Sequence, residues 1–152
     1  MHPDGASPWD GHLALPDRSA WFAVLQVEEQ RTRRHGGTHG LVLIRVEDPA
    51  GVRVLELAAA AISGTIRDID FLALVDRQTF AVLAIHCDDL PRLVARLRRA
   101  FDHPAFPGTT LIDGRPAGGD LQAVWNGMVG VRPAEPTGRH VDFVASSPLS
   151  LN

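Results

Sequence analysis

The feature that most restricts the fold of this chain is a pair of short apolar runs at residues 71–75 and 80–86. Both runs consist largely of aliphatic and aromatic residues, and the four residues between them are the polar sequence Asp76-Arg77-Gln78-Thr79. Two apolar runs separated by a short polar turn are typical of a β-hairpin. The sequence therefore predicts two adjacent antiparallel strands at the centre of the chain.

Helices and further strands are expected on both sides of the hairpin. Asp17 is placed to cap a helix that runs to about Arg34, and Gly36-Gly37 is placed to end it. The other expected elements are a strand at 41–44, a helix at 52–66, a helix that begins at 88 or 89, a strand at 110–112, a Gly- and Pro-rich loop, a helix at 120–128 and a strand at 140–145. This alternation, interrupted by a hairpin, predicts an α/β (α+β) fold with a mixed central sheet of about five strands flanked by helices.

The helix after the hairpin is expected to have one apolar side and one basic side. Its apolar residues recur at helical spacing and are Leu90, Leu93, Val94, Leu97 and Phe101. Arg92, Arg96 and Arg99 fall on the other side. Elsewhere in the chain, Trp21 and Trp125 are expected to be core anchors rather than platforms on which bases stack.

Length, charge and cysteine content exclude several classes of protein. A chain of 152 residues is one domain, which we assign to residues 10–145, with flexible polar tails at 1–9 and 146–152. A net charge of −3 favours neither nucleic-acid nor membrane binding. The single Cys87 fits a reducing compartment, and the N-terminus has no signal-peptide pattern, so we expect a cytoplasmic location.

Four segments spread over residues 10–145 carry a family resemblance. Residues 10–18 keep Asp10, Leu15, Pro16 and Arg18 of the motif D-x-L-T-G-L-P-N-R. Residues 33–44 read Arg-Arg-His-Gly-Gly before an apolar strand, residues 67–83 enclose the hairpin, and residues 138–141 are similar to G-R-N-x-V. In this order and at this spacing, the segments resemble the GGDEF domain of diguanylate cyclases.

The resemblance implies a degenerate, inactive member of this family. Diguanylate cyclases hold two metal ions with carboxylates, one at the end of the first strand and others in the signature turn Gly-Gly-Asp/Glu-Glu-Phe. Here the strand position is Arg45, and the turn reads Asp76-Arg77-Gln78-Thr79-Phe80. Because Mg²⁺ requires oxygen ligands such as carboxylates, we expect no metal cofactor and no cyclase activity. Glu47 is a possible acidic substitute, but it matches a less central family position.

Arg67 and Asp70 match a second site of the family. Many GGDEF domains carry an inhibitory Arg-x-x-Asp motif, five residues before the signature turn, that binds cyclic di-GMP. Arg67 and Asp70 have this offset, whereas three other copies of the motif, at 45/48, 99/102 and 139/142, do not. An Arg fork can bind the N7/O6 edge of guanine or a phosphate. The family often adds an Arg from the helix after the hairpin, for which Arg96 is the best match and Arg99 a neighbour on the same face.

Functions of three classes remain open at this point. The leading hypothesis is a catalytically inactive cyclic di-GMP receptor that signals through a protein partner or a homodimer. The alternative is a ligand-independent pseudo-enzyme that serves as a dimerisation or scaffold module. In that case Arg67 and Asp70 form only a surface salt bridge, and the helix arginines are a solvated face. The third is an active cyclase with altered metal ligands.

Overall fold

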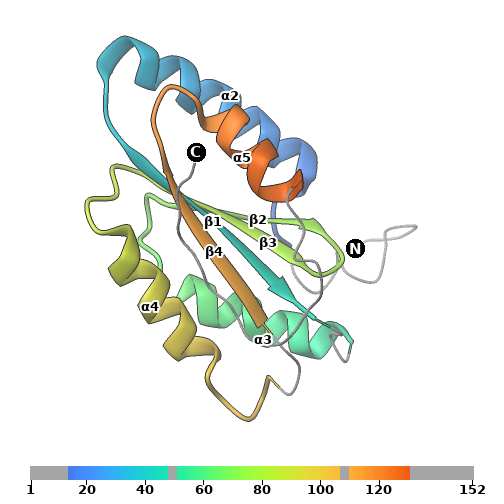
Figure 1. Ribbon diagram of the computed structural model, residues 1–152. Coiled ribbons are helices and arrows are strands. Elements are labelled where there is room, and N and C mark those ends of the chain that lie inside the picture. Colours follow the sequence, from blue (N-terminus) through green and yellow to red (C-terminus); the bar gives the residue numbers. More distant parts are fainter. Residues whose placement is uncertain (1–13, 48–50, 107–109, 131–152) are drawn as a thin grey trace.

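The structure, a computed structural model, describes residues 14–47, 51–106 and 110–130. These residues form one sheet with two helices against each face (Figure 1). In chain order the elements are α2 (Arg18–His35), β1 (His39–Val46), α3 (Val52–Ser63), β2 (Phe71–Asp76), β3 (Thr79–Ala84), α4 (Leu90–Phe101), β4 (Thr110–Ala117) and α5 (Leu121–Gly130). The central hairpin, β2–β3, confirms the feature from which the fold was predicted.

The sheet has the strand order β2-β3-β1-β4, and all three pairings between described strands are antiparallel. The sequence predicted a mixed sheet of about five strands, so the described sheet is one strand smaller and antiparallel throughout. The expected last strand, at 140–145, lies outside the described residues, as do both tails and the ends of the expected domain. No helix in the described ranges is long and apolar enough to cross a membrane.

Strand β1 is buried on both faces. Val42 and Ile44 pack against the layer of α3 and α4, whereas Leu41 and Leu43 pack against α2 and α5, because successive side chains of a strand point to opposite faces. This explains why the strand is a continuous apolar run rather than an alternating one. Trp21 and Trp125 are core anchors as predicted: both are buried, and their ring centroids lie 4.9 Å apart.

The predicted first residues of α2 and α4, and the predicted end of α2, are confirmed. Asp17 Oδ1 accepts a hydrogen bond from the Ala20 amide at 3.0 Å, and Asp89 Oδ1 accepts one from the Arg92 amide at 3.2 Å. Gly36, with φ +80°, ends α2 in a conformation that costs glycine little. The predicted apolar stripe of α4 is also confirmed, with four of its five residues buried: Leu90, Val94, Leu97 and Phe101.

Strand β4 is longer than the sequence predicted. Residues 113–117 were expected to belong to a loop because they include Gly114 and Pro116, but they continue β4 to Ala117. Strand β4 is an edge of the described sheet, where proline is tolerated. A Cβ atom on Gly114 would lie 2.7 Å from Val94 Cγ2. The glycine is therefore needed for the close approach of α4 to the sheet.

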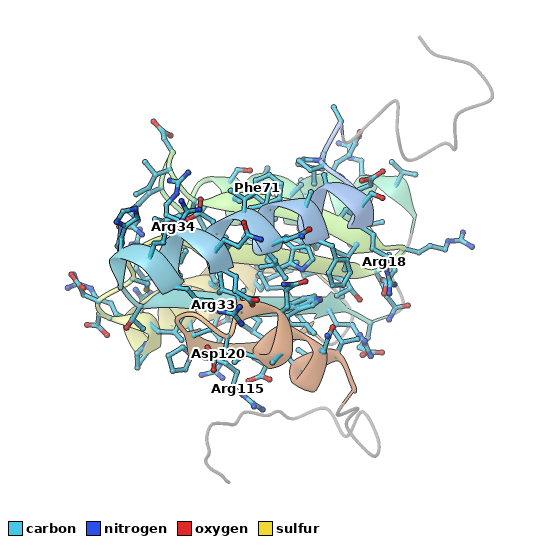
Figure 2. All side chains as sticks on the ribbon, turned by 90° about the horizontal axis from the view of Figure 1, so that it is seen from above. Arg18, Arg33, Arg34, Phe71, Arg115 and Asp120 are labelled. Carbon is cyan, nitrogen blue, oxygen red and sulfur yellow. The ribbon has the colours of Figure 1, made fainter. Side chains whose placement is uncertain are left out.

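Helix α5 lies beside α2 (Figure 2), and polar contacts join the two helices. Glu29, on α2, accepts hydrogen bonds from the amide and the side chain of Gln122, at 2.8 and 3.1 Å. Arg33 pairs with Glu29 at 3.2 Å, and its Nε donates to the carbonyl of Gly119 at 2.9 Å. A carboxylate thus lies at the N-terminus of α5, where the helix dipole favours negative charge.

Candidate functional site

Arg67 and Asp70 form an ion pair in the turn between α3 and β2. Arg67 Nη2 lies 3.0 Å from Asp70 Oδ1, and Arg67 Nε donates to Oδ2 at 3.2 Å. The Arg67 amide also donates to Oδ2, at 2.9 Å. This two-pronged geometry is the arrangement in which Arg binds a carboxylate most specifically.

Asp70 also ties the turn to the end of β3. Its Oδ1 accepts a hydrogen bond from the Ile85 amide at 3.0 Å, and Arg67 Nη2 donates to the Ile85 carbonyl. The Asp70 side chain is 2% exposed, whereas that of Arg67 is 51% exposed. The hydrogen bond of its side chain to Asp70 holds the pKa of Arg67 above its usual value. Asp70 is therefore a buried anchor that orients a half-exposed guanidinium.

A cavity of about 210 Å³ opens beside this pair. It is lined by residues from the α3–β2 turn, the end of β3 and the first half of α4, among them Arg67, Asp70, His86, Cys87, Asp88, Asp89, Arg92 and Arg96. The structure thus brings Arg96 to the predicted Arg67–Asp70 pair. Arg99 is not among the described lining residues, and Arg92 takes part instead, because it lies one helical turn before Arg96 on α4.

The cavity contains three arginines and three aspartates, but two of the carboxylates are already engaged. Asp70 binds Arg67 and Ile85, and Asp89 caps α4. Asp88 is exposed. Burial raises the pKa of the Cys87 thiol, which fits an inert cysteine rather than a nucleophile. Half-exposed Arg forks and one exposed carboxylate are therefore the groups available to a ligand.

The turn at 76–79 and Arg45, which the resemblance matches to the signature turn and to a metal position, meet at the opposite end of the sheet. Arg45 is the cross-strand neighbour of Thr79, and the Val46 amide donates to the Gln78 carbonyl at 2.9 Å. Asp76 Oδ1 is engaged by the Gln78 amide at 2.9 Å. Arg45 Nε and Thr79 Oγ1 are buried, and neither has a hydrogen-bond partner among the described residues.

This arrangement does not fit a pair of divalent cations. At the positions that the resemblance matches to metal ligands, the chain has the guanidinium of Arg45, the amide of Gln78 and the hydroxyl of Thr79, whereas Mg²⁺ needs carboxylate oxygens. Across the described ranges, no group of three or more His, Cys, Asp or Glu side chains is placed to hold a metal ion. Glu47 is half-buried beyond the end of β1.

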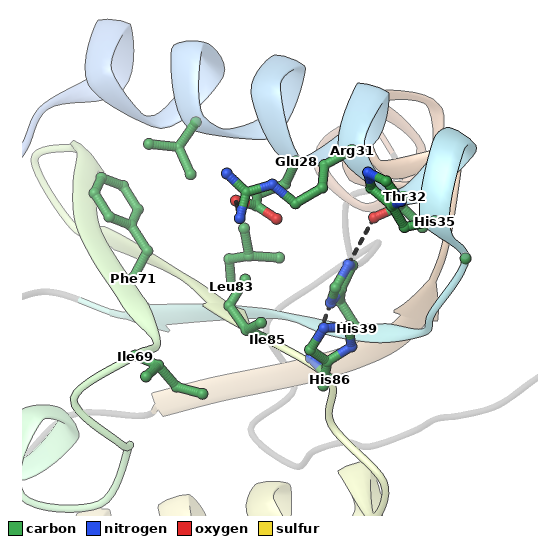
Figure 3. A pocket seen from close by; sticks show the side chains of 12 residues that line it. Glu28, Arg31, Thr32, His35, His39, Ile69, Phe71, Leu83, Ile85 and His86 are labelled. Atoms are coloured by element: carbon green, nitrogen blue, oxygen red, sulfur yellow. Dashed lines mark hydrogen bonds and ion pairs between the residues drawn. The ribbon is translucent and has the colours of Figure 1, made fainter.

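A second cavity, of about 640 Å³, lies on the α2 side of the sheet (Figure 3). Its walls include the apolar Phe71, Leu83 and Ile85, and its polar residues include His39. His86 lines both cavities and therefore lies between them. Sequence reasoning missed the two histidines, because 46 residues separate them and the sequence shows no metal-like His cluster.

No protein-family model matches the sequence, and no curated protein matches it. Solved structures do match. The isolated GGDEF domain of PA1120 (TpbB or YfiN) from Pseudomonas aeruginosa has a TM-score of 0.61 and 20% identity, over 70% of this chain and 74% of that one.

Two further matches were solved as complexes. The GGDEF domain of DgcB from Caulobacter crescentus, in complex with c-di-GMP, has a TM-score of 0.61 and 15% identity over 86% of this chain and 95% of that one. The diguanylate cyclase SiaD from Pseudomonas aeruginosa, in complex with its activator SiaC, has a TM-score of 0.64 and 20% identity over 82% of this chain and 53% of that one. The chain therefore has the fold of GGDEF domains.

Proposed function

We propose that this protein is a catalytically inactive GGDEF-like receptor for cyclic di-GMP, which binds at Arg67 and signals through contacts with a protein partner. The observation that carries the proposal is the cavity in which Arg67, Arg92 and Arg96 meet. Asp70 fixes the Arg67 guanidinium while leaving it half-exposed. A fork oriented before binding loses less conformational entropy when it engages a guanine or a phosphate.

The size of the cavity limits how a dinucleotide binds. Sites that enclose a drug-sized ligand measure about 300–1,000 Å³, and this cavity measures about 210 Å³. One base can enter it, while the phosphates and the second base lie over the surface of α4. Arg92 and Arg96 are on that surface and supply positive charge for the phosphates.

The proposal of inactivity rests on the other end of the sheet. Arg45 is a fixed cation beside Thr79, and it disfavours a divalent metal by charge repulsion. Glu47 is the nearest acid in sequence and would have to act without the turn carboxylates. The two functions of a GGDEF domain are thus separable here, since Arg67 and Arg45 lie at opposite ends of the hairpin.

The similar structures support a nucleotide and a protein as partners. DgcB was solved with c-di-GMP and SiaD with an activator protein. For this chain, α4 is the element best placed to meet a partner when ligand is bound. Two of the cavity arginines, Arg92 and Arg96, lie on its outer face together with further exposed residues.

Titration calorimetry with cyclic di-GMP tests the receptor hypothesis. Arg67→Ala should weaken binding about ten- to a hundredfold, since a hydrogen bond from a charged donor such as Arg67 Nη1 contributes roughly 1.5–3 kcal/mol. Arg96→Ala and Arg99→Ala form a matched pair on one helix, and Arg96→Ala should have the larger effect because only Arg96 lines the cavity. Absence of binding heat at tens of micromolar ligand would end the receptor hypothesis.

A scaffold function without a ligand is the second candidate. Ile69 and Val27 are unusually exposed for large apolar residues, at 61% and 55%, and exposed apolar side chains are typical of association sites. Light scattering with and without cyclic di-GMP separates the hypotheses. Association that is the same with and without cyclic di-GMP, and that is lost in Ile69→Ser, supports the scaffold hypothesis. Association that requires cyclic di-GMP supports the receptor hypothesis.

A further inference from the structure

The segment that follows β3 is held from two sides. On one side, Ile85 donates its amide to Asp70 and accepts a hydrogen bond from Arg67. On the other, the His86 amide donates to His39 Nδ1 at 2.9 Å (Figure 3). His86 has a φ of +48°, in the left-handed region that non-glycine residues seldom adopt. This conformation needs its hydrogen bonds, and His39 supplies one of them.

The contacts of His39 determine which ring nitrogen carries the proton when the ring is neutral. The residue is 2% exposed, and its Nε2 lies 2.8 Å from Thr32 Oγ1 on α2. Because Nδ1 accepts from the His86 amide, the proton of the neutral ring must be on Nε2 and is donated to Thr32. A protonated ring carries hydrogens on both nitrogens, so Nδ1 could no longer accept. Protonation of His39 therefore breaks the bond to His86.

We propose that His39 is a positioning residue for the Arg67 site, and that protonation of His39 weakens ligand binding there. The effect passes through one residue: released His86 no longer holds Ile85, whose amide and carbonyl are partners of Asp70 and Arg67. The inference rests on the proposed receptor function and names a form of regulation for the same site.

The surroundings of His39 set the direction of the pH dependence. Burial and the nearby His86 lower the pKa of His39 from its usual value, and Glu28 opposes them. Arg31 and His35 of α2 line the same cavity and add positive charge, while β4 presents the uncharged Ala117 opposite His39. Because the folded pKa is depressed, the stabilising contribution of neutral His39 is complete above about pH 6.5 and is lost as the pH falls below that value.

Three variants compared across pH test the proposal. Wild-type affinity for cyclic di-GMP should fall about five- to tenfold from pH 7.5 to a pH low enough to protonate His39, which lies below about 6.5 because the pKa of His39 is depressed, as one buried hydrogen bond is lost. In His39→Asn, the side-chain oxygen can accept at the position of Nδ1 and does not titrate, so the affinity should be nearly constant over this range. His39→Ala should bind at pH 7.5 as weakly as wild type does once His39 is protonated.

The control is His86→Gln, which keeps the backbone amide that donates to His39 and removes the His86 ring. The affinity should still fall with falling pH, but the fall should begin at a higher pH, because His86 no longer opposes the protonation of His39. A flat wild-type profile, or an unchanged slope in His39→Asn, would overturn the role of His39 while leaving the receptor hypothesis intact. Absence of binding at every pH would instead overturn the receptor hypothesis. The amide resonances of Ile85 and His86 should still shift with the His39 titration, which tests the structural step without ligand.

Discussion

Asp70 accepts four hydrogen bonds, and these give Asp70 and Arg67 different roles in the site. Three come from Arg67 and one from Ile85. The sequence indicated both residues but not this division, because the Ile85 amide is 15 residues from Asp70 and belongs to the backbone. A carboxylate whose oxygens are already engaged is better suited to orient Arg67 than to bind guanine itself.

Asp70→Ala should therefore reduce stability as well as affinity. It leaves the half-buried Ile85 amide without its acceptor, a loss of about 1 kcal/mol or more in the free energy of unfolding. Urea denaturation of Asp70→Ala and of Asp68→Ala, a change at an exposed neighbour, measures the difference. Equal midpoints for the two variants would contradict the anchoring role.

Asp88 is the exposed carboxylate of the cavity and the better candidate to accept hydrogen bonds from guanine. Asp88→Asn should weaken cyclic di-GMP binding by about three- to tenfold, as expected for one charged hydrogen bond. It should also reduce the preference for cyclic di-GMP over cyclic di-AMP. Isotherms with both dinucleotides measure this; identical losses for the two ligands would mean that Asp88 does not read the base.

For the helices and strands, features that depend on residues close in sequence could be predicted, whereas features that depend on residues far apart in sequence could not. The cap at Asp17, the stripe of α4 and the hairpin depend on residues close in sequence, and all were predicted. The predicted strand ended too early, because Gly114 favours a loop in its local sequence. In the structure, Gly114 instead leaves room in β4 for Val94 of α4. The bond from Gln122 to Glu29 spans 93 residues, so only the folded chain reveals it.

Glu29→Ala should loosen α5 from α2. The change removes the acceptor of the Gln122 amide and the partner of Arg33, and we expect a loss of about 1–3 kcal/mol in unfolding free energy. Because Trp21 and Trp125 belong to these two helices and are in contact, their fluorescence should report the loosening. Gln30→Ala, at an exposed site on α2, should leave the spectrum and the stability unchanged.

At the scale of the whole molecule, the Arg67–Asp70 pair and the neighbours Arg45 and Thr79 lie at opposite ends of the sheet. Incubation with GTP and Mn²⁺ should give no cyclic di-GMP above a control without protein, because the resemblance places Arg45, Gln78 and Thr79 at positions where carboxylates are expected. Chromatography of the reaction measures the product. A product that disappears in Glu47→Ala would show that Glu47 substitutes for the missing carboxylates and that the protein is an enzyme.

The pairing of Arg45 with Thr79 restricts the mutational paths open to this sequence. Thr79→Glu alone would put a carboxylate beside the guanidinium, and the two would form an ion pair instead of a metal ligand. Arg45→Asp alone would set one carboxylate beside a hydroxyl, which is too little negative charge for Mg²⁺. Natural selection that acts on one substitution at a time would therefore find no advantage in either step. Because the register between β1 and β3 sets Arg45 beside Thr79, a carboxylate pair at this place would require both substitutions.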